Sequence, residues 1–284
     1  MNRSVAIILI AIATLLGIFY LYLNSQGEKS IPQQAARHDT TPGGHQPVPQ
    51  GQRTYEPEIT SDTTNIRPNQ PIKFSYKIKN DKGEILKKYE IAHEKIMHFI
   101  VVRKDLQNFQ HLHPDFNQEN DEFSIDISFP TDGPYRVFPD FTPSLDNPQK
   151  LPVTVFHDME VGDMDQYTAQ PVESKTQPSQ EIGSYRITYE LSPIMAGNEI
   201  NYSLTIEKDN QPVTDLQTYL GALGHSVILK KDSLDFIHTH AGETGTGPKI
   251  KFATTLPQSG VYKIFTQFQH RNKVITTDYV TMVN

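Results

Sequence analysis

Histidine is the residue whose spacing in this chain points to chemistry. His98, His111 and His113 recur as His225, His238 and His240, and the offset is 127 for every pair (225−98, 238−111 and 240−113). The two sixteen-residue windows that these histidines bound share six identical positions, and three of the six are histidines. The imidazoles have therefore changed less between the two copies than the residues around them.

Strand geometry gives this spacing a physical meaning. Residues i and i+2 of a strand point to the same face, so both imidazoles of a His-x-His segment lie together. A hairpin with its loop at 105–108 would pair Lys104 with Phe109. Any even loop length places His98 on the face of His111 and His113, and the second copy has the same parity.

A metal site is the first interpretation of these triads. The same face carries Ile100, Val102 and Phe109, so we expect the imidazoles to project toward the core side and to be neutral. Three neutral histidines with an open fourth position suit Zn(II) or Cu(II). The second interpretation is inherited packing, in which the imidazoles bond backbone carbonyls at one end of the fold.

The other candidate residues carry weaker signals. We interpret His93, His157 and His270 as surface or edge residues because the other copy has no counterpart of them. Asp115 and Glu243 follow the His-x-His segments and are interpreted as solvated loop acids, although either would add a carboxylate ligand. His38 and His45 are interpreted as solvated residues of a linker.

Short β-like runs separated by turn signals predict an all-β fold. About seven strands per unit favour two tandem immunoglobulin-like β-sandwiches, at 56–161 and 182–284, joined by a linker at 162–181. The first unit is expected to differ by an inserted loop near 139–150, where Pro139, Pro143 and Pro148 occur.

The N-terminal segment at 1–55 predicts that the protein is exported and attached to a membrane. Residues 1–23 contain an uncharged apolar run that predicts a transmembrane anchor or, as the alternative, a cleaved signal segment. Residues 24–55 are rich in Gln, Pro, Gly and Thr and predict a disordered linker. We therefore expect a single-pass membrane protein whose C-terminal region is extracytoplasmic, or a secreted protein if the segment is cleaved.

Composition excludes several classes of function. The absence of cysteine removes disulfides, thiolate metal sites and thiol catalysis. The net charge of -7, without a basic cluster, argues against a nucleic-acid partner. No catalytic triad or carboxylate pair is evident, so we expect a protein that is not an enzyme, with a zinc hydrolase as a weaker alternative that lacks a general base.

The segment from His98 to Pro114, which reads His-(x)6-Asp-Leu-(x)2-Phe-x-His-x-His-Pro, resembles a group of exported bacterial tandem β-sandwich proteins of poorly defined function. That group is associated with copper and heavy-metal handling. The resemblance covers both units, and the second copy departs from it with Ser233 and Ala241. It implies metal handling at His98, His111 and His113, and by repetition at His225, His238 and His240.

Two hypotheses follow. The first is a membrane-tethered extracytoplasmic protein that buffers or delivers copper or zinc. The second is a structural or protein-interaction module of two immunoglobulin-like domains that binds no metal.

Overall fold

The computed structural model describes residues 55–144, 151–172, 178–192, 194–242 and 245–284. The predicted anchor, most of the predicted linker at 24–55, Pro148 and Glu243 lie outside these residues. Within them the fold is all-β, as predicted, and the only helix is the 3-10 turn η1 (Met164–Gln166). No helix in this part of the chain is long and apolar enough to cross a membrane.

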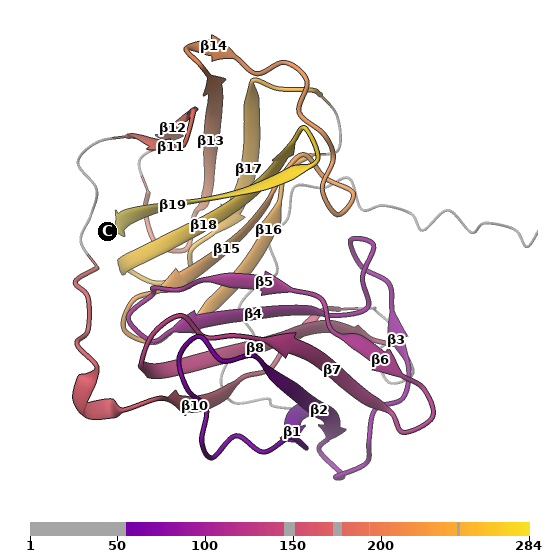
Figure 1. Ribbon diagram of the computed structural model, residues 1–284. Helices are drawn as coiled ribbons and strands as arrows, with labels where there is room; N and C mark the ends of the chain where they lie inside the picture. Colours follow the sequence, from indigo (N-terminus) through magenta and orange to yellow (C-terminus); the bar gives the residue numbers. More distant parts are fainter. Residues whose placement is uncertain (1–54, 145–150, 173–177, 193, 243–244) are drawn as a thin grey trace, which may run out of the picture. The chain divides into compact units, whose positions relative to one another are not determined.

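The first repeat consists of two antiparallel sheets (Figure 1). One sheet has the order β1 (Tyr55–Ile59), β2 (Ile72–Asn80), β7 (Glu122–Ile127), β6 (Asp115–Asn117). The other has the order β10 (His157–Val161), β8 (Gly133–Pro143), β4 (His98–Arg103), β5 (Gln110–Leu112), and the short strands β3 (Tyr89–Glu90) and β9 (Val153–Thr154) pair with β8.

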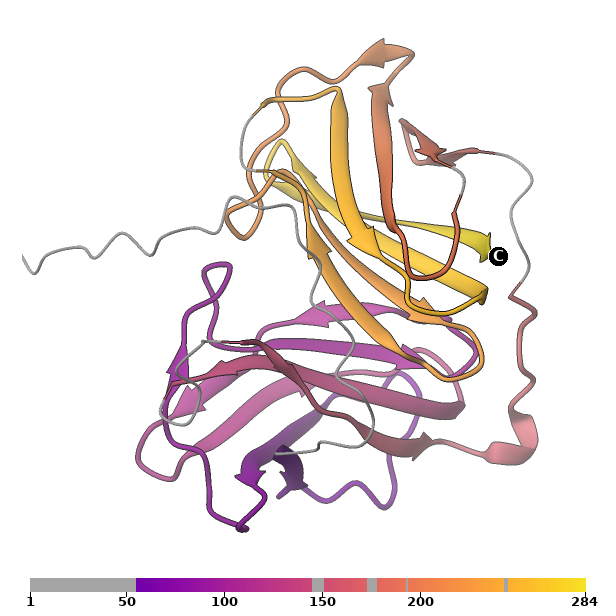
Figure 2. The same cartoon turned by 180° about the vertical axis from the view of Figure 1, so that it is seen from behind.

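The second repeat also has two sheets, drawn in orange and yellow in Figure 2. The first contains β11 (Ser179–Ile182), β12 (Tyr185–Leu191), β13 (Glu199–Lys208) and β14 (Gln211–Pro212) in that order, with β17 (Lys249–Thr255) on the other side of β13. The second has the order β16 (Phe236–His240), β15 (His225–Lys230), β18 (Gly260–His270), β19 (Lys273–Val283).

The constant offset between the copies predicts the equivalent strands. β8 spans 133–143 and β18 spans 260–270, so the two strands are equivalent and are separated by the same 127 residues as the histidines. The prediction of an inserted loop near 139–150 is therefore wrong for the first part of that segment, because Pro139 and Pro143 lie inside β8. Pro139 has no N–H to donate to the sheet, and its carbonyl accepts from Val155 N at 3.0 Å.

Each repeat buries its own core between its two sheets. In the first repeat, Phe99 and Val101 of β4 pack with Phe74 and Tyr76 of β2. In the second repeat, Ile228 of β15 packs with Leu204 and Ile206 of β13. The residues of β4 and β15 that face the core of their own repeat therefore alternate with those on the face that carries His98 or His225. The histidine face lies on the opposite side of the sheet.

That opposite face is buried as well, and this corrects the expectation that the histidines point into the core of their own repeat. Ile100 and Val102 of the first repeat form one apolar cluster with Val227 and Leu229 of the second. Val172, from the segment predicted as a linker, joins the same cluster. All six residues of β4 are buried, because one face packs on the other sheet of its own repeat and the other face packs on the second repeat.

The contact between the repeats is reciprocal. Phe109 stacks on Phe265 with ring centroids 4.4 Å apart, and Phe138 packs on Phe236 at 5.1 Å. Phe236 is the counterpart of Phe109 and Phe265 is the counterpart of Phe138, each at the same offset as the histidines. Two copies of one surface therefore meet each other in the manner of a two-fold dimer interface.

We expect Phe138→Ala to destabilise the chain by about 3–5 kcal/mol, because it removes a fully buried ring from the cluster shared by the repeats. Urea unfolding followed by circular dichroism measures this loss. Met195→Ala, at a residue that is 60% exposed, is the control and should change stability by no more than about 0.5 kcal/mol. A loss below about 1 kcal/mol for Phe138→Ala would contradict the shared burial.

Candidate metal centre

The β4–β5 hairpin brings the first histidine triad together. Its register pairs Phe99 with Leu112 and Ile100 with His111, so His98 stands opposite His113. The predicted pairing of Lys104 with Phe109 is two residues out of register, but the parity is unchanged and the three imidazoles share one face. In the second repeat, His225 pairs with His240 and Val227 with His238, which is the same arrangement.

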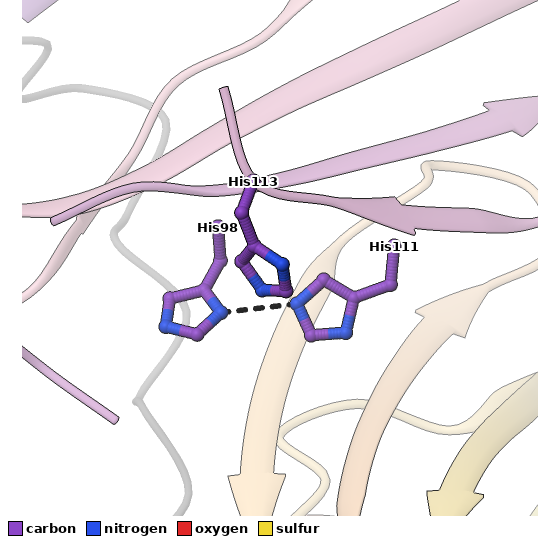
Figure 3. A group of neighbouring side chains, drawn as sticks. All are labelled: His98, His111 and His113. Carbon is purple, nitrogen blue, oxygen red and sulfur yellow. Dashed lines mark hydrogen bonds between the residues drawn. The ribbon is translucent and has the colours of Figure 1, made fainter. Parts of the chain in front are cut away.

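The first triad is compact. One ligand nitrogen from each of His98, His111 and His113 lies within 4.8 Å of the others, and Figure 3 shows the three rings pointing toward one another. Their ring centroids are 5.2 Å, 5.1 Å and 4.8 Å apart. Imidazoles bound to one tetrahedral ion at ~2.0 Å place their ring centroids about 5 Å apart, so the triad has the spacing of a metal site.

The second triad is wider. The centroids of His225, His238 and His240 are 5.7 Å, 5.8 Å and 6.0 Å apart. Among the described residues, the first triad alone forms a group of three ligands within 4.8 Å of one another. The two copies are therefore equivalent in register but differ in how closely their imidazoles approach.

The two triads also adjoin each other, which the sequence did not predict. His98 lies 5.3 Å from His238 and 6.3 Å from His225, measured between ring centroids. His111 lies 6.0 Å from His238. The six predicted histidines therefore form one group at one end of the contact between the repeats.

His93 belongs to the same group, so its interpretation as a surface residue is wrong. It occupies a tight turn with positive φ at His93 (48°) and Glu94 (64°), and its ring centroid is 3.8 Å from that of His240. The equivalent turn of the second repeat has Leu220 at this position, at φ 53°. Repetition could not identify His93 because its counterpart is apolar.

Hydrogen bonds orient the first triad. The Nε2 atom of His98 lies 3.1 Å from the carbonyl oxygen of Ala92, so Nε2 carries the proton and donates. The Nδ1 atom of His111 donates to Oε1 of Gln267 over 2.8 Å, and the amide nitrogen of Gln267 donates to Thr276 Oγ1. Both rings use their outer nitrogens as donors to fixed acceptors.

The inner nitrogens then face each other as lone pairs. His98 Nδ1 and His111 Nε2 are 3.0 Å apart, and this contact is the dashed line in Figure 3. The two outer hydrogen bonds and the contact between the inner nitrogens would each use one proton, which makes three, but two neutral imidazoles supply only two. With Oε1 of Gln267 as the acceptor, no proton remains for the contact between the inner nitrogens, and a metal ion placed there would be bound by both lone pairs.

In the second repeat, hydrogen bonds from the outer nitrogens orient the histidines in the same way. His225 Nε2 donates to the carbonyl oxygen of Leu220 over 3.2 Å, and its Nδ1 is buried without a hydrogen-bond partner. His238 Nδ1 donates to Oδ2 of Asp140 over 2.8 Å. Asp140 is the counterpart of Gln267, so each repeat supplies the acceptor that orients a histidine of the other.

Burial keeps the imidazoles neutral. The pKa of His111 lies well below its ordinary value, because the ring is buried and because His98 and His113 are close. Burial, followed by His98 and Lys95, lowers the pKa of His113 to about 3. Burial also holds the pKa of His225 well below 6.5, with His93, His111, His240 and His98 adding to the effect. At neutral pH these three rings are in the ligating form.

The remaining candidates lie away from the cluster or have structural roles. Asp115 is exposed on β6 and His157 is half-buried on the edge strand β10. His270 is buried, contrary to prediction, and bonds Tyr185 Oη at 2.8 Å and Asp215 Oδ1 at 3.0 Å. Asp140 is the acidic residue of the cluster that sequence reasoning missed.

The chain belongs to a family described as a domain of unknown function (DUF8832), which matches residues 52–161 and again residues 180–284. The family is thus present as two tandem β-rich domains, and its description assigns no function. A comparison with curated proteins finds no match.

Solved structures with a distant likeness include a DUF4426 family protein from Pseudomonas aeruginosa, 7% identical, with a TM-score of 0.24 over 37% of this chain and 94% of that one. Escherichia coli alpha-2-macroglobulin is 10% identical, with a TM-score of 0.27, and 81% of this chain matches 20% of that protein. A DUF4785 family protein from Legionella pneumophila is 9% identical, with a TM-score of 0.25 over 80% of this chain and 55% of that one. Likenesses at this level carry no information on function.

The lowered pKa values predict that the metal-free chain loses stability as the pH falls below about 6.5. In the unfolded chain these histidines take up protons near pH 6.5, whereas in the folded chain they do so only at lower pH. Each therefore contributes stability that is present above pH 6.5 and is lost toward the folded pKa, at up to about 1.4 kcal/mol per pH unit.

Urea unfolding in the presence of a chelator, at pH 7.5, 6.0 and 5.0, measures this dependence. His113→Asn should flatten the curve because it removes one of the three groups. Equal stability of the wild-type chain at all three pH values would contradict the neutral, buried state of the cluster.

Proposed function

We propose that this chain is a metal-binding protein that takes up Cu(II) or Zn(II) through its histidine cluster, with His98, His111 and His113 as the primary ligands. The observation that supports this best is the pair of inner nitrogens, His98 Nδ1 and His111 Nε2, which face each other at 3.0 Å while both outer nitrogens bond acceptors. Outer-nitrogen bonds of this kind fix metal-ligating histidines in the ligating orientation.

The chemistry of the donor set favours a borderline divalent ion. Neutral imidazole suits Zn and Cu, and the chain has no cysteine that would select a soft monovalent ion. The six histidines predicted from the sequence all belong to the cluster, so the proposal covers His225, His238 and His240 as well. We assign buffering or delivery of the ion, because the sequence places no nucleophile beside the triads.

We further propose an immunoglobulin-like fold for each repeat and an extracytoplasmic location on a membrane tether. Tyr135 Oη donates to the Thr131 carbonyl at 3.0 Å, and Tyr262 Oη donates to the Gln258 carbonyl at 2.9 Å. A tyrosine that bonds the backbone a few residues upstream at a strand start is a feature of immunoglobulin-like sandwiches. The proposed location rests on the apolar run within residues 1–23.

A structural module that binds no metal is the second candidate, and a specific observation favours it. The bonds from His111 to Gln267 and from His238 to Asp140 join the repeats directly. In this case the histidines serve as hydrogen-bonding residues of the contact between the repeats, and the chain presents its loops or sheet edges to a protein partner.

Metal uptake by the purified full-length chain separates the two candidates. We expect wild-type protein to bind Cu²⁺ or Zn²⁺ at micromolar concentration at pH 7.5. The double variant His111→Ala and His113→Ala should lose that binding, and equilibrium dialysis with elemental analysis measures both. His157→Ala, outside the cluster, is the matched control and should bind as the wild type does.

Binding should also raise thermal stability, by about 2.7 kcal/mol at a free metal concentration a hundred times the dissociation constant. The metal proposal fails if the wild-type chain takes up neither ion, or if the double variant binds as tightly as the wild type while remaining folded.

A further inference from the structure

His238, a residue of the second repeat, lies beside the first triad. Its ring centroid is 5.3 Å from that of His98, which is close to the 5.2 Å between His98 and His111. Its distance to His111 is 6.0 Å. His238 therefore lies next to the first triad. Its separation from His98 is that of two imidazoles around one ion, and it lies farther from His111.

Asp140 fixes the orientation of His238. The Nδ1 atom of His238 donates to Asp140 Oδ2, so the proton is on Nδ1 and Nε2 carries the lone pair. Asp140 is itself held by Thr154, whose hydroxyl donates to Oδ1 over 2.9 Å. A carboxylate that bonds the outer nitrogen of a histidine is the usual support of a metal ligand and raises its basicity.

The charge of Asp140 adds a second argument. The residue is 2% exposed, and its carboxylate accepts from the imidazole of His238 inside the contact between the repeats. The corresponding position of the second repeat holds the neutral Gln267, which orients His111. The two repeats are thus not equivalent, and the negative charge supports one particular histidine, His238.

A small pocket reaches this place. Its lining includes His93, His98, Asp140 and His238, together with Ala92 and Lys95. The pocket therefore lies where His98 and His238 of the two repeats adjoin.

We infer that His238 is the fourth ligand of the ion held by His98, His111 and His113, so that one shared site joins the two repeats. The inference rests on the proposed function, because it concerns the same ion. Asp140 is a positioning residue of this site. Instead of two independent sites, one in each repeat, the chain then has a single tight site with four imidazoles.

Cu²⁺ titration of the full-length chain against a competing chelator tests the stoichiometry and the affinity. We expect one tightly bound Cu²⁺ per chain, and an affinity at least about tenfold lower in His238→Ala. Asp140→Asn keeps a hydrogen-bond acceptor and loses the charge, so a smaller loss is expected, and His157→Ala is the unchanged control. Pulsed electron paramagnetic resonance counts the bound imidazoles, which should fall from four in the wild type to three in His238→Ala.

The outcomes separate this inference from the proposed function. If the wild-type chain binds no Cu²⁺, the proposed function fails and the shared site with it. If His111→Ala weakens binding while folded His238→Ala keeps the wild-type affinity and imidazole count, only the shared site is overturned. Two equivalent ions per chain, of which His238→Ala removes one, also overturn it. His238→Gln, which retains a donor toward Asp140, is the second variant if His238→Ala does not fold.

Discussion

The burial of β4 and β15 on both of their faces is the constraint on which the rest of the structure depends. One face of each strand packs on the core of its own repeat, and the other packs on the same face of the other repeat. The histidines lie at one end of that second face. Because the contact is reciprocal, a residue of one repeat that meets a given position of the other has a counterpart that meets the equivalent position in return, as His111 meets Gln267 and His238 meets Asp140.

This contact explains both the spacing and the protonation of the histidines. Desolvation keeps His111, His113 and His225 neutral. Acceptors from the backbone and from the opposite repeat bond the outer nitrogens of His98, His111, His225 and His238. The lone pairs are thereby directed toward one another. The two copies have diverged at the acceptors, with Asp140 in one and Gln267 in the other, and at the turn that holds His93 or Leu220.

Much of the fold was predictable because strand patterns and the constant offset between the copies can be seen in the sequence itself. The β16 strand has the bounds expected for it, Phe236–His240, and the parity of the hairpin followed from the pleat alone. The direction of the histidine face was not predictable in the same way. Apolar residues occupy both faces of β4, so alternation could not tell which face was the core of the repeat and which was the contact with the other.

The site was predictable only in part for a related reason. Repetition identifies residues that both copies share, and it found the six histidines. Asp140 and His93 differ in type from their counterparts, Gln267 and Leu220, and they reach the cluster through long-range packing rather than through spacing. The assignment of two separate triads had the same origin, since a repeated pattern says nothing about where the two copies meet.

A crystal structure of the full-length chain grown with Zn²⁺, with anomalous data at the zinc edge, tests the central claim most directly. The account predicts one strong anomalous peak about 2.0–2.1 Å from a nitrogen of each of His98, His111, His113 and His238. Imidazoles that remain hydrogen-bonded to one another without an anomalous peak, or a peak outside the cluster, would contradict it.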